Sequence, residues 1–531
     1  MQTFSRKLYT FACRFIQIFS LILTSLLFLG AFLTTCYSKD MDSQLVLTRF
    51  DNPLLNLLGM ALFSGFLVVL WRLFQKRRIR LLTVLVLAWC LLIGAVLVVF
   101  GKTVPAADAM SVYSIAEALA GGDTSVIHPT DSYLSYYPQQ VGLTAFFELL
   151  IRLRKLLPGN LPAYHFIKCL YVLLACIIIL FQEKTVHLLW ENETADCIYL
   201  LLAGANLPFL MYTSFVYGEI PSFTAVTLGF YLLAGLYKGE IYSRRKKILL
   251  SVGALLFLSL AVMLRKNNLI LIIAVLIVTF LQWIKTRKPL LLVWGVICGL
   301  CCFSILPAIQ KCYELRAGTY LKSGVTATSY FAMGMQESSR ANGWYNGFNF
   351  YTYQETGMDT DATNAISKEA IKERLNTFRE DPAYTLRFYL GKHLSQWADG
   401  TYASRQATLA TFGGRSPFFV SLYEGNASRF FIEYCNIYQN MLYLGSLFFC
   451  LTAFRKKQDS LPLYLGLIGM IGGFLFHIIW EANSRYILLY GLLLMPYATE
   501  GLAGFAKFFL TSHENGGMSI VHPAAHKHLE V

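Results

Sequence analysis

Two carboxylates stand so close to long apolar segments that neither can lie far from a membrane surface. Asp108 follows a hydrophobic run that ends at residue 100, and Glu219 stands in the stretch SFVYGEIPSF, between two further runs. Positioned carboxylates are common general bases, and an ionisable residue at membrane depth suggests function. The simpler interpretations are an N-cap of a surface helix for Asp108 and a solvated turn residue for Glu219. The two interpretations of Asp108 are compatible, because a capping carboxylate still presents an oxygen to the aqueous side.

Basic side chains occur at similar positions in two other places. Arg265 and Lys266 lie in the short turn MLRKNNLI, and Arg485 lies in WEANSRYILL, four residues after Glu481. The planar arginine fork and the lysine ammonium both suit a phosphate group. The alternatives are snorkelling anchors for Arg265 and Lys266, and an i,i+4 ion pair between Glu481 and Arg485.

A further polar and aromatic cluster occurs late in the chain. The segment LGKHLSQWADGTY contains Lys392, His393, Trp397 and Asp399. A tryptophan beside polar groups suits stacking on a sugar ring, although anchoring at the membrane interface is its commoner use. His393 by itself does not indicate a metal site. No nucleotide-binding, metalloprotease or serine-hydrolase motif stands out, so we expect no cofactor, and a divalent metal lacks support.

The composition indicates an integral membrane protein that is all α-helical. Of the 531 residues 56% are hydrophobic and only 14% are charged, whereas soluble domains carry about 25% charged residues. Apolar runs of roughly 20 residues, each long enough to cross a bilayer as a helix, recur along the chain. The predicted spans are 12–35, 53–72, 81–100, 164–182, 195–214, 221–237, 248–264, 268–284, 290–309, 436–454, 461–480 and 487–506.

The net charge of +14 reflects membrane topology and not a nucleic-acid partner. The basic residues gather in short loops, and short basic loops face the cytoplasm. These loops contain Arg6/Lys7, Lys76–Arg80, Arg244–Lys247, Lys285–Lys288 and Arg455–Lys457. With both termini cytoplasmic, every acidic and basic candidate above falls at the same outer boundary of the membrane.

Two long segments lie on the predicted outer side. The first, 101–163, is expected to contain surface helices near 108–120 and 140–157. The second, 310–435, is polar and aromatic and is expected to contain a helix at 362–380. Loops of this length are usually functional or disordered, and their aromatic content argues against disorder.

These boundaries divide the chain into four parts. They are an N-terminal pair of spans (1–80), a membrane core with the first outer segment (81–309), the second outer segment (310–435), and a final group of spans with a cytoplasmic tail (436–531). The N-terminal run ends in LTTC and resembles a lipoprotein signal, but it is too long for one, so we expect an uncleaved first span.

The twelve cysteines show no spacing typical of a disulfide framework. Cys298, Cys301 and Cys302 resemble a metal or redox motif, but they lie within an apolar run. We therefore expect them to be small core residues.

The order of these features resembles the GT-C superfamily of glycosyltransferases that use polyprenyl-phosphate sugars. It is most similar to bacterial members related to protein O-mannosyltransferases and lipid A aminoarabinose transferases. That pattern has an acidic residue in the first large outer loop, surface helices, a YP-type motif and a second acidic residue in the next outer turn. Here these are Asp108, the helix 108–120, Tyr136-Tyr137-Pro138 and Glu219.

The resemblance implies a GT-C-like bundle of about twelve helices in a bacterial cell membrane. The donor would be a sugar on a polyprenyl monophosphate, used on the extracytoplasmic face. Asp108 would be the general base for an inverting attack by the acceptor hydroxyl, and Glu219 would orient donor or acceptor. The residues expected to contact substrate are Arg265, Lys266 and Arg485, which would hold the lipid phosphate, together with Tyr137, Lys392 and Trp397. The acceptor would be a cell-envelope polysaccharide, teichoic acid, glycolipid or protein, selected by the segment 310–435.

Two other functions remain compatible with the number of spans. A flippase or secondary transporter would be expected to show inverted repeats and midplane charges, which the chain lacks. A polysaccharide polymerase or ligase would concentrate basic catalytic residues in the late outer segment, where Arg405 and Arg415 are the candidates.

Overall fold

The computed structural model describes residues 2–39, 44–74, 78–130, 132–238, 242–409 and 416–514, and the part it describes is essentially all α-helical. Within these ranges eleven helices are long and apolar enough to cross a membrane, or twelve if a bent pair counts as one span. The long helices are α1 (Gln2–Leu33), α2 (Pro53–Phe74), α3 (Ile79–Phe100), α7 (Ala163–Trp190), α10 (Glu219–Lys238), α11 (Arg244–Leu264), α12 (Leu269–Thr286), α13 (Pro289–Ala317), α20 (Asn426–Arg455), α21 (Leu465–Ile479) and α22 (Leu488–Glu514). Each predicted span overlaps one of these helices or the bent pair, which confirms a polytopic membrane protein.

The fifth predicted span is the bent pair. Helix α8 (Glu193–Ala205) ends before Asn206, and α9 (Leu207–Met211) continues into the 3-10 turn η3 (Tyr212–Ser214) at an angle of 55°. Pro208 cannot donate a backbone hydrogen bond to the preceding turn, and the Asn206 side chain caps the new helix by accepting from the amide of Phe209 at 3.2 Å. Apolar composition alone does not reveal this break.

A short β-hairpin follows the first helix, where the sequence predicted the continuation of a span to residue 35. Strand β1 (Thr34–Ser38) pairs antiparallel with β2 (Val46–Phe50). The consecutive β-branched residues Thr34 and Thr35 favour extended backbone, so α1 ends at Leu33. The hairpin contacts the late part of the chain, because the amide of Cys36 donates to the carbonyl of Ala398 at 2.9 Å.

The two long segments between spans are largely helical. The first contains α4 (Ala107–Gly121), α5 (Tyr133–Tyr136), η2 (Pro138–Gln140) and α6 (Val141–Leu156), close to the predicted 108–120 and 140–157. The second contains α14 (Ala327–Gly334), α15 (Phe348–Glu355), α16 (Thr360–Glu380), α17 (Pro382–Trp397), α18 (Ser404–Leu409) and α19 (Pro417–Glu424). The predicted helix 362–380 is α16, which begins two residues earlier because Asp359 caps its first turn. The other helices of this second segment were not predicted.

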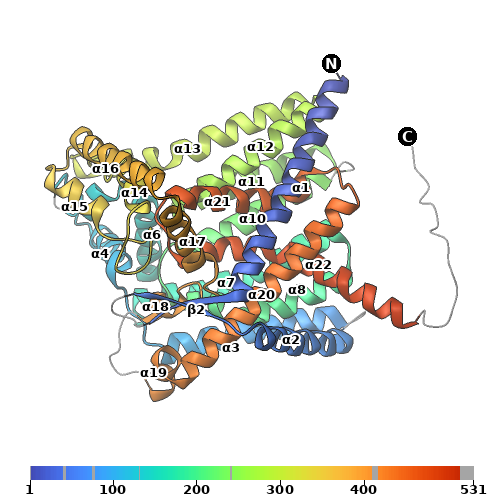
Figure 1. The fold of residues 1–531 in the computed structure, drawn as a ribbon. Helices are drawn as coiled ribbons and strands as arrows, with labels where there is room; N and C mark the ends of the chain where they lie inside the picture. Colours follow the sequence, from blue (N-terminus) through green and yellow to red (C-terminus); the bar gives the residue numbers. More distant parts are fainter. Residues whose placement is uncertain are drawn as a thin grey trace.

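The two long segments pack against each other. The amide of Val325 donates to the carbonyl of Tyr136 at 2.9 Å, and the rings of Tyr136 and Phe350 stack with centroids 5.0 Å apart. Helices α4, α14, α15 and α16 accordingly lie together on one side of the molecule (Figure 1). The segments form one assembly at one end of the bundle.

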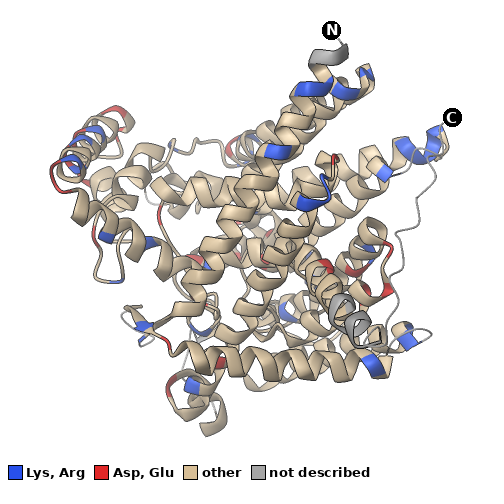
Figure 2. Cartoon of the chain, turned by 45° about the vertical axis from the view of Figure 1, so that its right-hand side comes forward, with Lys and Arg blue, Asp and Glu red and all other residues tan. Residues whose placement is uncertain are grey.

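Basic residues gather at the other end. There the ring of Tyr9 near the start of α1 lies 4.1 Å from the ammonium of Lys285 at the end of α12, and Arg14 donates to the carbonyl of Phe454 at 3.1 Å. Figure 2 shows Lys and Arg mostly near helix ends. Helix α1 has 32 residues and is therefore about 48 Å long, which separates this basic end from the hairpin and the assembly beside it.

Candidate functional site

Asp108 lies at the start of α4 but does not cap it, so the predicted N-cap is wrong. The N-cap residue is Ala106, which has extended backbone and no side-chain cap bond, and Ala107 follows at φ 47°. Asp108 is instead the second residue of the helix and is exposed. Its carboxylate interacts electrostatically with the hydroxyl of Tyr133. The carboxylate is favoured by the helix dipole and leaves an oxygen available to a ligand.

Glu219 lies in the centre of a group of charges with no exposed surface of its own. Its Oε1 atom lies 2.5 Å from Nη1 of Arg265 and 3.6 Å from Nε of Arg485. Two guanidinium groups therefore share one carboxylate, and the group carries one net positive charge. A buried unpaired charge is costly, so this arrangement favours binding of an anion.

Arg485 does not form the predicted i,i+4 pair with Glu481. Residues 480–483 are not helical, and the chain re-enters helical structure only at η6 (Ser484–Ile487). The Arg485 guanidinium turns instead toward Glu219 and is enclosed by rings, with its Cζ 5.6 Å from the centroids of Tyr217 and Tyr486. A contact between the start of α10 and η6 thus replaces a local pair.

Tyr217 links this charged group to the first long segment. Its hydroxyl accepts from Nε2 of Gln140 at 2.5 Å, and its carbonyl accepts from the hydroxyl of Tyr171 at 2.6 Å. The Asp108 carboxylate interacts electrostatically with the same tyrosine and raises its pKa, together with burial of the ring. Tyr217 is thus the residue on which both Asp108 and the Arg485 guanidinium act.

Glu481 is a second carboxylate that acts on the same residues, whereas the sequence suggested it only as a partner of Arg485 among the charges at this boundary. The side chain is only 7% exposed and interacts with Arg485, Asp108, Arg340 and Tyr486. Burial raises the pKa of this carboxyl to about 7. Paired carboxylates with different environments are typical of sites that move protons. A signal was available, since an acidic residue interrupts an apolar segment there.

Tyr137, predicted to bind substrate, interacts electrostatically with both carboxylates. Its ring is half-buried and lies 4.9 Å from that of Tyr133, and burial, Tyr345, Asp108 and Glu481 raise the pKa of its hydroxyl. Tyr345 comes from the second long segment, so aromatic rings from both segments line the site.

The other predicted substrate contacts lie in different surroundings. Lys266 is exposed, next to Arg265. Lys392 has no exposed surface, and its ammonium donates to the carbonyls of Gly334, Ile478 and Trp480 at 2.5, 3.0 and 2.8 Å. Trp397 is 3% exposed and packs on Phe474. The expectation that Lys392 and Trp397 contact substrate is therefore not supported, because backbone carbonyls and core side chains already surround them.

The remaining polar candidates of the late segment are also internal. Asp399 accepts from Thr401 and Ser484 at 2.6 Å each, and the His393 ring stacks on Phe474 at 4.8 Å. Arg405 is buried and donates to the carbonyl of Tyr423, and Arg415 lies outside the described residues.

The cysteines behave as small apolar residues. Cys298 and Cys302 in α13 are buried, Cys301 is half-buried, and all three are free thiols. Among the described residues, no three His, Cys, Asp or Glu side chains gather where they could share a metal ion.

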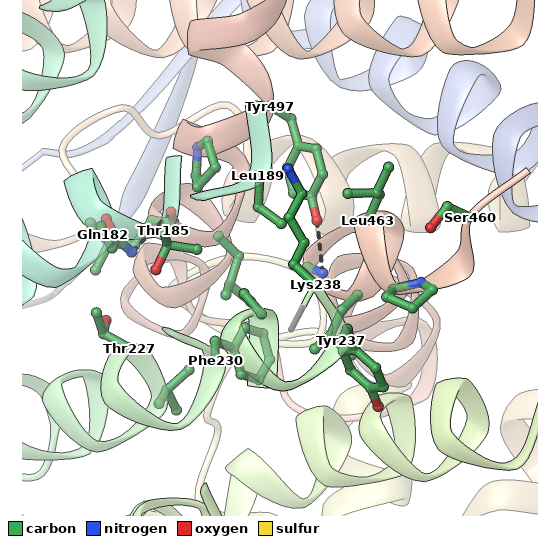
Figure 3. Close-up of a pocket in the computed structure, with 18 of the residues that line it drawn as sticks. Gln182, Thr185, Leu189, Thr227, Phe230, Tyr237, Lys238, Ser460, Leu463 and Tyr497 are labelled. Carbon is green, nitrogen blue, oxygen red and sulfur yellow. Dashed lines mark hydrogen bonds between the residues drawn. The ribbon is translucent and has the colours of Figure 1, made fainter. Parts of the chain in front are cut away.

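A cavity of about 210 Å³ lies apart from these charges, between α7, α10, η5 (Leu461–Tyr464), the start of α21, and α22. Figure 3 shows its wall, with Gln182 and Thr185 from α7, Thr227 and Lys238 from α10, and Tyr497 from α22. Most of the lining is apolar, and Lys238 at the end of α10 marks its basic end. None of the predicted site residues lines it.

Comparison with solved structures matches this chain at low similarity to an archaeal oligosaccharyltransferase. One solved structure is the oligosaccharyltransferase AglB from Archaeoglobus fulgidus in complex with an inhibitory peptide and a dolichol-phosphate, with TM-score 0.40 and 14% sequence identity over 83% of this chain. The apo form of the Archaeoglobus fulgidus oligosaccharyltransferase gives TM-score 0.42 with the same identity and coverage. The chain spans about half the length of these proteins, 52% and 53%. No protein-family model and no curated protein sequence matches the chain.

Proposed function

We propose that this protein transfers a sugar from a polyprenyl-phosphate donor to a hydroxyl group of an extracytoplasmic acceptor. The observation that carries the proposal is that Asp108 and the Glu219–Arg265–Arg485 group both act on one tyrosine, Tyr217. An available carboxylate and a net positive group lie in one site, although they come from segments far apart in the sequence. Such a site offers a base for a hydroxyl and a counter-charge for a phosphate.

The reaction follows from these two charges. Asp108 accepts the proton of the acceptor hydroxyl while the hydroxyl oxygen attacks the anomeric carbon of the sugar. The bond between that carbon and the phosphate oxygen breaks, and its electron pair leaves with the lipid phosphate. Arg485 and Arg265 stabilise the negative charge that develops on the phosphate, and the configuration at the anomeric carbon inverts. No oxidant, reductant or nucleotide is consumed.

The roles of the surrounding residues follow from their positions. Glu219 keeps both guanidinium groups oriented and acts on the donor through them. Lys266, exposed next to Arg265, adds positive charge where a phosphate would approach. Tyr137 offers a half-buried ring and hydroxyl beside Asp108. The second long segment covers this end of the bundle, where it would select the acceptor.

The orientation that suits this function is the one that the basic loops favour. With the basic end of the bundle and both termini in the cytoplasm, the site faces the outside of a bacterial cell membrane. The acceptor would then be a cell-envelope polysaccharide, teichoic acid, glycolipid or protein.

Release of lipid phosphate tests the proposal directly. Purified protein in lipid nanodiscs is given polyprenyl-phosphate sugars and an envelope extract as acceptor, and both sugar transfer and free polyprenyl phosphate are measured. Transfer with equal release of lipid phosphate, lost in folded Asp108→Asn, supports the enzyme and its base. No release from any donor by folded wild-type protein contradicts the proposal and favours a polymerase, ligase or flippase.

A further inference from the structure

The non-helical segment between α21 and η6 carries Glu481. Several tertiary hydrogen bonds hold this break between the helices in place. The ammonium of Lys392 accounts for two of them, since it donates to the carbonyls of Ile478 and Trp480, immediately before Glu481. The carbonyl of Glu481 itself lies 3.1 Å from Nδ1 of His477. The backbone on the N-terminal side of Glu481 is therefore fixed from α17 and α21.

The C-terminal side of the break is fixed in the same way. The amide of Ala482 donates to the carbonyl of Gly343 at 2.8 Å, and Gln396 donates to the carbonyl of Asn483 at 3.2 Å. Ser484 donates to the carboxylate of Asp399 at 2.6 Å. These partners all belong to the second long segment, which therefore bonds to three consecutive positions of the chain, 482–484.

The side chain that this scaffold presents faces the reaction site. Glu481 is 7% exposed, and none of the ion pairs found within 4 Å in the described part of the chain includes it. The ionisable groups that interact with it or with its neighbours come from several separate segments: Asp108, Tyr137, Tyr330, Arg340, Tyr345, Lys392, His477, Arg485 and Tyr486. Of these, Asp108 is the other carboxylate, and its charge acts on Glu481.

We infer that Glu481 is the second carboxylate of the transfer reaction, sharing with Asp108 the proton of the acceptor hydroxyl, and that Lys392 positions it. The inference rests on the proposed function. The acceptor hydroxyl loses its proton to the pair of carboxylates, which holds one proton after the attack and releases it to water. The pair is the stronger base when Glu481 is charged, because a protonated Glu481 leaves only Asp108 to accept the proton. Lys392 acts on the reaction only through the carbonyls beside Glu481.

The inference explains why the second long segment contains so many buried polar groups. A loop that only covered a site would need no ammonium inside it, since burying a charge is costly without partners. The hydrogen bonds of Lys392, Gln396 and Asp399 instead hold the non-helical segment between α21 and η6 in one place. Precise placement of a reacting group within roughly 0.5 Å is what such a supporting shell supplies.

The pH dependence of turnover tests the role of Glu481. Transfer is measured from pH 5 to 9 in wild type, Glu481→Gln and Glu481→Asp, with Glu369→Gln on the exposed face of α16 as the matched control. Wild type should lose activity below about pH 7, following the pKa of Glu481. In Glu481→Gln, turnover should fall roughly 100-fold or more, and the loss of activity at low pH (the acid limb) should disappear. Glu481→Asp should have a lower rate than wild type but should keep the acid limb.

The role of Lys392 is tested with the same assay. Lys392→Met should lower turnover and shift the acid limb while leaving the KM for the donor unchanged, and Lys372→Met, an exposed lysine of α16, should change neither. An unchanged rate and acid limb in folded Glu481→Gln overturns the inference. If that variant does not fold, an unchanged rate in Glu481→Asp overturns it instead. Transfer by wild type in either case leaves the proposed function intact, whereas no transfer by wild type contradicts the proposed function and the inference that rests on it.

Discussion

The Nη1 atom of Arg265 lies 2.5 Å from Oε1 of Glu219, a carboxylate with no exposed surface. The two residues are separated by the whole of α10 and α11, and their contact fixes the ends of both helices at one boundary. Arg485 approaches the same oxygen at 3.6 Å. Because both guanidinium groups approach this one oxygen, removing any one of the three side chains changes the charge balance of the other two.

Replacing Glu219 by Gln should destabilise the protein strongly. The change leaves two largely buried guanidinium groups without their carboxylate, and breaking a buried ion pair from one side costs about 3–5 kcal/mol. Thermal unfolding in detergent measures the loss. Glu369→Gln, which breaks an exposed pair with Lys372, should cost less than about 1 kcal/mol. Equal melting temperatures for the two variants would mean that the guanidinium groups are solvated.

Asp108→Asn should leave stability within about 0.5 kcal/mol of wild type. The Asp108 side chain forms no N-cap bond, since Ala106 is the N-cap residue. Turnover should nevertheless fall by about 10²–10⁴-fold, because the variant lacks the base. The melting temperature and the release of polyprenyl phosphate are measured on the same preparation. Full activity in the folded variant would remove Asp108 from the mechanism.

Arg485→Lys should weaken donor binding although the charge is retained. Lysine lacks the planar fork that approaches Glu219 and lies among Tyr217 and Tyr486. Losing a charge-assisted hydrogen bond costs about 1.5–3 kcal/mol, so the KM for the donor should rise at least tenfold. Arg49→Lys on the hairpin, whose partner is Glu433, serves as the control. An unchanged KM in Arg485→Lys would place the phosphate elsewhere.

Gly343→Ala should disturb the site through Lys392. A Cβ at this position would lie 2.6 Å from Cδ and Cε of Lys392, on a backbone with φ 71°. Gly357 is the matched control, because it has φ 65° but open space around it. Both substitutions carry the strain of about 1–2 kcal/mol of a left-handed residue, whereas only Gly343→Ala should also lower turnover. Equal activity of the two variants would show that Lys392 tolerates displacement.

Stability should fall as the pH rises from about 5 to 8, and Glu481 should account for part of the fall. Burial raises the pKa of this carboxyl from 4.5 to about 7, so the folded state holds a proton that the unfolded chain has lost. The contribution of Glu481 to the free energy of unfolding is complete below pH 4.5 and is lost as the pH rises through 7. The loss is at most about 3 kcal/mol.

Lys392 acts with the opposite sign. Burial lowers the pKa of its ammonium to about 7, so the contribution of Lys392 to the free energy of unfolding increases above neutral pH. Thermal unfolding of wild type and Glu481→Gln at pH 5 and pH 8 separates the two residues. The difference between the two pH values should be smaller in Glu481→Gln, because the amide stays neutral at both. An equal difference would mean that Glu481 does not keep its proton in the folded protein.

The sequence by itself determined the membrane helices and the end of the bundle at which the candidate residues gather. Both follow from local properties, since about 20 apolar residues must form a helix across a bilayer and basic loops orient the chain. The surface helices near 108–120 and 140–157 were also predictable, because apolar residues recur at helical spacing there. Asp108, Glu219, Arg265 and Arg485 were singled out for the same reason, as charged residues at the ends of apolar segments.

Only the tertiary structure decided which of these residues act on one another. Glu481 and Arg485 are four residues apart, but the chain is not helical at 480–483, so a partner 266 positions earlier, Glu219, replaces the local one. Lys392 and Trp397 have the composition of a surface site and are buried, because packing of α17 against the break before η6 surrounds them with carbonyls and rings. Pairing of charges across distant segments depends on how the helices pack, and that information is not contained in any local pattern.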